Sequence, residues 1–257
     1  MSQIHPTAII APEAVLGDNV TVGPYCTIGP QVRLGSDTVL MSHVVVDGHT
    51  TIGAGCRLFP FACIGMQTQD LKFAGGVTYA AVGDRTTLRE YVTINTGTRE
   101  GEVTRVGSGC LLMAYCHVAH GCVVGDRVIM SNGCQLAGEV AVGEKAILSG
   151  LVAVHQFVRI GAMAMVGGLS KVQQDCPPFM ITDGNPPHVR GPNSVGLQRS
   201  GLEAETRQAL KQAYRLLHRE GLSTSSAVAR IREELPRLPE LELLTEFYEK
   251  SERGVTR

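Results

Sequence analysis

Large aliphatic residues recur along the chain at a spacing of six. Every sixth position from Ile4 to Val172 makes 29 positions, and 26 of them hold Ile, Leu, Val or Met. The three exceptions, Asp70, Gly76 and Glu100, lie in two polar stretches. Neither the period of an amphipathic helix nor the alternation of a half-buried strand produces this rule. The pattern predicts hexapeptide repeats that wind into an all-β parallel β-helix.

The residues around the large aliphatic positions support this interpretation. Glycine often follows them, as at Gly17, Gly23 and Gly29, where the absence of a side chain eases the corner of a coil. Three repeats complete one triangular coil, so equivalent residues stack on coils about 4.8 Å apart. The polar stretches near 66–81 and 96–105 interrupt the repeat and are predicted to be loops that leave the coil.

The repeat stops after Val172. Residues 176–196 are rich in Pro and Gly and are interpreted as an ordered crossing segment. From Gly201 the pattern turns helical, with one apolar face spaced i, i+3, i+4 and i+7, formed by Leu210, Ala213, Tyr214 and Leu217. Further helices are expected over 224–235 and 239–252. We therefore expect the β-helix over residues 1–187 and a small α-helical C-terminal domain over residues 188–257.

Composition narrows the possible functions. The net charge of −1 argues against a protein that binds nucleic acid over its whole surface. The sequence contains no apolar run of the roughly 18 residues needed to span a bilayer. Its first residues, MSQIHPTAII, lack the basic and apolar segments of a secretory signal. A cytoplasmic protein is the expectation.

The cysteines follow the repeat. Seven of the eight fall at the small inward-facing position, and Cys63 alone does not; the seven are Cys26, Cys56, Cys110, Cys116, Cys122, Cys134 and Cys176. A structural zinc site needs paired ligands such as C-x-x-C, which this sequence lacks. Disulfides are not expected in the cytoplasm. We interpret these cysteines as small buried apolar residues.

The stretch MAYCHVAHGC, residues 113–122, contains two of the chain's eight histidines. By the stacking rule, His120 shares a column with Gly138 and Gln156. The neighbouring column contains Ala119, Ala137 and His155, so His155 lies two coils from His120, about 10 Å along the axis. His117, His120 and His155 are therefore not expected to converge within one subunit. The small residues beside His120 leave a groove, where a histidine can accept a proton from a hydroxyl group.

Several stretches resemble one enzyme family. They are QDLKF (69–73), AYCHVAHGC (114–122), SGLVAVHQF (149–157), MVGGLSKVQQDCPP (165–178), GNPP (184–187), NSVGLQR (193–199) and the ending SERGVTR. Together they resemble the acyl-ACP–UDP-N-acetylglucosamine O-acyltransferases, hexapeptide-repeat enzymes that open lipid A biosynthesis. The resemblance implies a left-handed β-helix and a homotrimer with active sites between subunits. It also implies acyl carrier protein (ACP) as a partner, UDP-N-acetylglucosamine as acceptor, and no metal or other cofactor.

The resemblance also implies residue roles. His120 would be the general base that deprotonates the 3-hydroxyl of the sugar, and the N–H of Gly138 would face the oxyanion. Asp70 would contact the sugar and Lys72 a phosphate. The full set of expected substrate-binding residues is Gln69, Asp70, Lys72, His117, His155, Gln156, Asn193 and Arg199. Gly168 matches a position that limits acyl length in the family, and its missing side chain suggests a longer chain.

The sequence departs from the family pattern near the base. The family usually has Asp after the catalytic His and His after the oxyanion Gly, whereas this chain has Gly121 and Glu139. Positions 121 and 139 share a column, so Glu139 is a third candidate catalytic residue, which would supply the missing carboxylate and orient His120. Pro186 and Val195 also depart from the pattern. The acceptor is therefore open between the usual sugar nucleotide and a 3-amino variant.

Other interpretations remain open. A γ-type carbonic anhydrase would use His117, His120 and His155 to bind zinc between subunits, although the spacing of the first two fits poorly. A nonenzymatic scaffold that binds acyl carrier protein, and an N-acyltransferase that acts later on lipid A, are further candidates. On the predicted helix, Arg207, Lys211, Arg215 and Arg219 form a basic stripe. This stripe is a candidate docking surface for the acidic carrier protein, the alternative being a solvated helix face.

Overall fold

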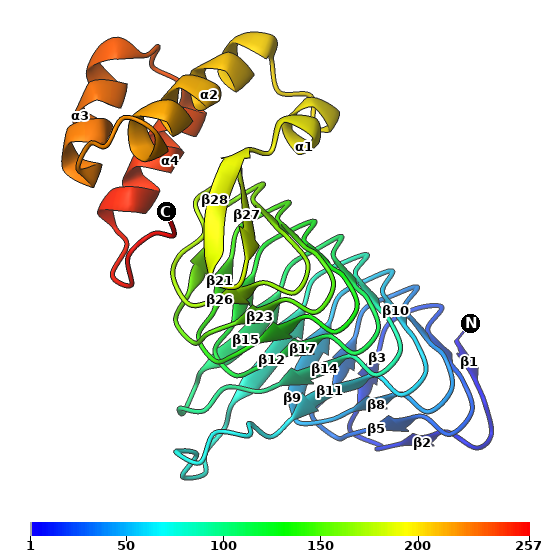
Figure 1. Cartoon of the computed structure of the whole chain (residues 1–257). Coiled ribbons are helices and arrows are strands. Elements are labelled where there is room, and N and C mark those ends of the chain that lie inside the picture. Colours follow the sequence, from blue (N-terminus) through cyan, green and yellow to red (C-terminus); the bar gives the residue numbers. More distant parts are fainter. Residues whose placement is uncertain (1) are drawn as a thin grey trace.

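The computed structural model describes residues 2–257. A triangular coil of short parallel strands runs from the N-terminus, and a group of helices lies at its far end (Figure 1). The strands stack into three sheets, which we name sheets A, B and C in the order in which the chain visits them. The register between most successive coils is 18 residues, as in the pair Thr21 and Val39.

Nine strands of sheet A belong to the coils and two form a terminal hairpin. They are β1 (Gln3–Ile4), β4 (Thr21–Val22), β7 (Val39–Leu40), β10 (Arg57–Leu58), β13 (Thr87–Leu88), β16 (Leu111–Leu112), β19 (Ile129–Met130), β22 (Ile147–Leu148), β25 (Met165–Val166), β27 (Met180–Gly184) and β28 (Pro187–Pro192).

Sheet B contains nine strands and sheet C eight, all parallel. Sheet B consists of β2 (Ile9–Ile10), β5 (Thr27–Ile28), β8 (Val45–Val46), β11 (Cys63–Met66), β14 (Thr93–Asn95), β17 (His117–Val118), β20 (Gln135–Leu136), β23 (Ala153–Val154) and β26 (Lys171–Val172). Sheet C consists of β3 (Val15–Leu16), β6 (Arg33–Leu34), β9 (His49–Ile52), β12 (Tyr79–Val82), β15 (Val103–Val106), β18 (Val123–Val124), β21 (Ala141–Val142) and β24 (Arg159–Ile160).

The side chains at the sixth-residue positions fill the axis of the coil. From Val22 to Val172 every aliphatic residue in this phase is at most 3% exposed. Ile4 is 49% exposed because no earlier coil covers the first one. The seven cysteines predicted to face inward are buried, and Cys63 is only partly so. Burial raises the pKa of the Cys122 thiol to about 12, so this thiol stays neutral and packs as an apolar group.

Two loops leave the coil where the repeat is interrupted. The first loop, residues 67–78, connects β11 to β12, and the second loop, residues 96–102, connects β14 to β15. Both project from the same side of the β-helix, drawn in cyan and blue-green in Figure 1. The expected ranges, 66–81 and 96–105, included the ends of these flanking strands.

The first and second loops are fastened to each other. The carboxylate of Glu100 accepts a hydrogen bond from the N–H of Val77 at 2.8 Å. The N–H of Gly101 donates to the carbonyl of Val77 at 2.8 Å. The hydroxyl groups of Thr68 and Thr98 lie 3.1 Å apart. The two loops therefore form one unit at the side of the coil.

The segment interpreted as a crossing contains a hairpin. Strand β27 extends sheet A in parallel with β25, and β28 returns antiparallel to it. The expected domain boundary between residues 187 and 188 falls at the start of β28. Four helices follow, α1 (Ser194–Arg199), α2 (Ala204–His218), α3 (Thr224–Glu234) and α4 (Pro239–Glu249). They share a second apolar core with Met163, Phe179 and Val189 of the coil and hairpin.

Among residues 2–257, no helix is both long and apolar enough to cross a bilayer.

A stack of aromatic rings runs along the corner between sheets A and B. Five aromatic rings stack along it with neighbouring centroids 4.8 to 5.0 Å apart, from Tyr25 through His43, Phe61 and Tyr91 to Tyr115. All five residues have a positive φ, a backbone conformation that most residues other than Gly rarely adopt. The stacking of identical corners, coil upon coil, places these rings in contact.

Candidate active site

His120 lies at the corner between sheets B and C. The corner follows β17, and the backbone carbonyl of His120 accepts a hydrogen bond from the N–H of Glu139 on the next coil at 2.9 Å. The first and second loops replace this same corner on the two preceding coils. The coil therefore brings the unit formed by the two loops beside His120.

The imidazole of His120 lies directly over Gly138. A Cβ atom at position 138 would lie 2.2 Å from Nε2 of His120, so only glycine leaves room for the ring. The side chain of His120 is 17% exposed, and its Nε2 lies 3.6 Å from a carboxylate oxygen of Asp70 on the first loop. Within residues 2–257 the N–H of Gly138 makes no hydrogen bond.

A cavity of about 530 Å³ opens at this corner. Seven of the predicted catalytic and binding residues line it, together with Leu71, Asn95, Ala119 and Ala137; the seven are Gln69, Asp70, Lys72, His117, His120, Gly138 and Gln156. The structure therefore brings the first loop, His117, His120 and Gly138 to one site.

His117 lies on sheet B and lines the same cavity as His120. Its Nδ1 is 2.7 Å from the hydroxyl of Thr93 on the preceding coil. Burial lowers the pKa of His117, and the positive charge that His120 can take lowers it further. His117 is therefore neutral at pH 7, which leaves its second ring nitrogen for a hydrogen bond to a substrate.

The carboxyl group of Glu139 occupies the space beside Gly121. A Cβ atom at position 121 would lie 2.8 Å from Oε2 of Glu139. Glu139 lines a second cavity of about 350 Å³. This cavity shares four lining residues with the first, namely Asp70, Lys72, His120 and Gln156. Positions 121 and 139 share a column, as the sequence predicted. The carboxyl group of Glu139 thus lies beside Gly121, which has no side chain of its own.

Two residues of the second loop also reach this site. A guanidinium nitrogen of Arg99 lies 3.7 Å from Glu139, and the ligand atoms of Glu102, His120 and Glu139 all lie within 4.8 Å of one another. Sequence reasoning missed Arg99 and Glu102 because the hexapeptide rule does not apply inside a loop. The signal that could have found them is that both loops replace the corner to which His120 belongs.

Four other predicted residues lie outside these cavities. His155 accepts a hydrogen bond at Nδ1 from Arg253 in the C-terminal tail, at 3.2 Å. Asn193 is buried, where its amide group caps α1 and donates to the carbonyl of Met163. Arg199 is exposed at the end of α1, and Gly168 is exposed at the corner between sheets A and B. Their roles toward substrate stay predictions.

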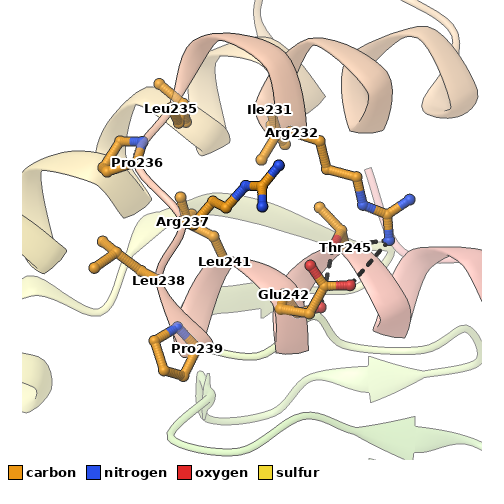
Figure 2. A pocket seen from close by; sticks show the side chains of 10 residues that line it. All are labelled: Ile231, Arg232, Leu235, Pro236, Arg237, Leu238, Pro239, Leu241, Glu242 and Thr245. Atoms are coloured by element: carbon orange, nitrogen blue, oxygen red, sulfur yellow. Dashed lines mark hydrogen bonds and ion pairs between the residues drawn. The ribbon is translucent and has the colours of Figure 1, made fainter.

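A separate cavity of about 490 Å³ lies in the helical domain, between α3 and α4 (Figure 2). Arg232 hydrogen-bonds to Glu242 and Thr245 on one side of it, and apolar residues such as Leu238 line the other side. None of the predicted catalytic or binding residues contributes to its lining. The chemistry of the molecule is therefore concentrated at the corner that holds His120.

The geometry at His120 places an imidazole beside a backbone N–H that makes no hydrogen bond within residues 2–257. In the described chain, His117, His120 and His155 do not form a three-histidine metal site, and the one group of potential metal ligands at this corner is Glu102, His120 and Glu139. The arrangement suits removal of a proton from a hydroxyl group and stabilisation of negative charge on a carbonyl oxygen.

Two family models match the chain. Residues 104–138 match the bacterial transferase hexapeptide (six repeats). Residues 175–256 match the second domain of UDP N-acetylglucosamine O-acyltransferase.

Relatives and solved structures agree with these matches. An acyl-ACP–UDP-N-acetylglucosamine O-acyltransferase of Verminephrobacter eiseniae is 47% identical over 263 aligned residues, which cover all of both chains. One from Synechocystis is 51% identical over 170 residues, 66% of this chain and 62% of that protein. LpxA of Acinetobacter baumannii matches with 42% identity and a TM-score of 0.96 over the whole of both chains. The UDP-N-acetylglucosamine acyltransferase of Bacteroides fragilis matches with 38% identity and a TM-score of 0.96, over 98% of this chain and 99% of that one.

A left-handed β-helix of hexapeptide repeats with a histidine over a bare glycine defines a hexapeptide-repeat acyltransferase. These relatives give no support to a zinc enzyme or to a 3-amino sugar acceptor. The chain belongs to the acyl-ACP–UDP-N-acetylglucosamine O-acyltransferase family.

Proposed function

We propose that this enzyme transfers a 3-hydroxyacyl chain from acyl-ACP to the 3-hydroxyl of UDP-N-acetylglucosamine, the first step of lipid A biosynthesis. The observation that carries the proposal is the packing of the His120 ring over Gly138, inside the cavity that the first loop closes. A cytoplasmic location is part of the proposal, since the eight cysteines are free thiols, as a reducing compartment keeps them.

The reaction follows from the positions of these groups. His120 takes the proton of the sugar hydroxyl, whose oxygen attacks the thioester carbon. The N–H of Gly138 stabilises the negative charge on the carbonyl oxygen. The C–S bond then breaks, and the proton passes from the imidazolium to the departing sulfur of the carrier's prosthetic arm. The step needs no other reactant, and acyl-ACP is the only donor.

The remaining residues of the cavity suit the sugar nucleotide. Asp70 is the neighbour of His120 on the first loop and is proposed to bind the sugar, while the exposed Lys72 binds a phosphate. Gln69, His117 and Gln156 supply hydrogen-bonding groups along the same wall. Lys72 carries the positive charge closest in sequence to Asp70, and its flexible side chain suits a phosphate.

Completion of the site by a second subunit is part of the proposal. Arg199 and His155 lie outside the cavity that holds His120, and Leu71 at its edge is fully exposed. An exposed leucine beside a polar site suits a surface that another copy of the chain covers. We propose a homotrimer in which the neighbouring subunit contributes Arg199 and His155, with Gly168 bordering the acyl chain.

The experiment that tests the function is product analysis with UDP-N-acetylglucosamine and a panel of 3-hydroxyacyl-ACPs of increasing length. We expect an O-acylated sugar nucleotide, with a preference for the longer acyl chains because Gly168 has no side chain. His120→Ala should lower kcat by about 10²-fold or more, since it removes the base. Chelators should leave the rate unchanged. Full activity of H120A, or loss of activity with EDTA, would contradict the mechanism.

A mixing experiment tests whether the active site lies between subunits. His120→Ala and Arg199→Ala subunits would be coexpressed with different affinity tags, and the doubly tagged oligomers isolated. Each doubly tagged closed trimer should regain about a third of the wild-type activity, because one of its three sites then combines an intact His120 from one subunit with an intact Arg199 from its neighbour. Activity no higher than that of the single variants would show that each site belongs to one subunit.

A further inference from the structure

The second loop places the carboxyl group of Glu102 beside His120 and Glu139. Glu102 accepts hydrogen bonds at Oε2 from the backbone N–H groups of Thr98 and Arg99, the latter at 3.3 Å. These donors hold Glu102 in its ionised form and lower its pKa, although burial acts in the opposite direction. Glu102 is therefore an ionised carboxylate in a fixed position.

Glu139 lies against this fixed carboxylate. Carboxyl oxygens of Glu102 and Glu139 lie within 4.8 Å of each other, so the ionisation of one group depends on that of the other. Burial raises the pKa of Glu139, and the charge of Glu102 raises it further. Two carboxyl groups this close do not both ionise readily. Glu139 is thus the member of the pair that holds a proton more readily.

The pair faces a base that already has an acidic neighbour. One ring nitrogen of His120 lies within 4.8 Å of both carboxyl groups, and Nε2 lies 3.6 Å from Asp70. Three ionised carboxylates around one imidazole would hold it protonated and unable to act as a base. The other charged or titratable groups at this site are His117, Lys72, Arg99 and Glu100.

We propose that Glu102 is a positioning residue that acts through Glu139. The proton shared by the two groups holds the Glu139 carboxyl beside Gly121 and limits the pair to one negative charge, so His120 stays free to accept the substrate's proton. This inference rests on the proposed function for the role of His120. The pairing of the two carboxyl groups does not depend on it.

A double-mutant cycle tests the coupling. Glu102→Ala should lower kcat about 10-fold in the wild type but less than about 3-fold in a Glu139→Ala background, because the residue acts through its partner. Glu102→Gln should stay within about 3-fold of wild type, since the amide can accept from the loop N–H groups and donate to Glu139. The matched control is Glu100→Ala, which removes a hydrogen bond between the two loops. The free-energy cost of E100A, calculated from the loss of kcat, should add to that of E139A.

Infrared difference spectroscopy tests the shared proton in isosteric variants. The wild type should show the C=O stretch of a protonated carboxyl group at neutral pH. This band should disappear in both Glu139→Gln and Glu102→Gln and persist in Glu100→Gln. Either of two results would overturn the inference. One is a band that persists in E102Q, and the other is a fold-loss of kcat in the E102A/E139A double variant that equals the product of the losses in the two single variants. A wild type without acyltransferase activity would instead refute the proposed function and leave the spectroscopic result to decide the pairing.

Discussion

At the scale of single residues, the site depends on one missing methyl group. His120 packs its Nε2 where a Cβ of residue 138 would lie, and Gly138 is buried. The N–H of the same glycine donates no hydrogen bond within residues 2–257. Position 138 therefore sets the position of the His120 ring.

Gly138→Ala should leave the coil folded and lower kcat by about 10²-fold or more, because the new methyl group displaces the imidazole. The matched control is Gly150→Ala, where the nearest atom to a new Cβ is 3.7 Å away. Circular dichroism should be unchanged for both variants. Near-normal turnover of G138A would show that the ring position seen here is not the reactive one.

At the scale of elements, the helical domain contains a buried histidine away from the site. Nε2 of His218 on α2 lies 2.7 Å from the hydroxyl of Tyr248 on α4, and its ring stacks on Tyr214. Burial, with smaller contributions from Arg257 and Arg219, lowers the pKa of His218 to about 4. The neutral ring is therefore part of the packing between α2 and α4.

This pKa makes the stability of the helical domain depend on pH. The unfolded chain binds a proton at His218 near pH 6.5 and the folded chain only near pH 4. The contribution of neutral His218 to the free energy of unfolding is thus complete above pH 6.5. It falls by roughly 3 kcal/mol as the pH drops toward 4. Urea denaturation at several pH values measures it. His218→Gln should weaken this dependence, whereas His188→Gln, a control at an exposed position, should retain it.

At the scale of the whole molecule, α2 presents its basic stripe on the domain that follows the coil. Lys211, Arg215 and Arg219 are exposed, but Arg219 donates to the hydroxyl of Tyr214, and Arg207 is partly buried. Arg215 also lies 3.8 Å from Glu220. Two of the four predicted residues are therefore the best placed to meet an acidic partner.

Reversal of both charges, Lys211→Glu with Arg215→Glu, should raise the KM for acyl-ACP several-fold at low ionic strength, with the effect shrinking as salt screens it. The KM for UDP-N-acetylglucosamine should not change. Arg33→Glu with Arg85→Glu, on the β-helix, introduces the same charge change as a control. An unchanged KM for acyl-ACP would mean that the stripe is only a solvated helix face.

The sequence alone determined the β-helix and the stacking columns that bring His120 to Gly138 and Gly121 to Glu139. These follow from a local rule, since each repeat forms the same strand and corner and the side chain at every sixth position must be buried. The catalytic roles of His120 and Gly138 were predicted from the family resemblance and stay predictions. The hairpin of β27 and β28 was not predicted, because its Pro and Gly residues resemble those of an irregular segment. Helix α1 was missed because six residues are too short for an apolar periodicity to appear.

Only the tertiary structure decided which loop residues meet the base and which candidates face elsewhere. Asp70 reaches His120, Glu102 reaches Glu139, and Asn193 uses its amide inside the protein to cap α1. A loop has no repeat to define its path, so its side chains are placed by hydrogen bonds to distant segments, such as that of Glu100 with Val77. The coil's regular spacing could be read from the order of residues, whereas the contacts between its loops arise only when the folded chain brings them together.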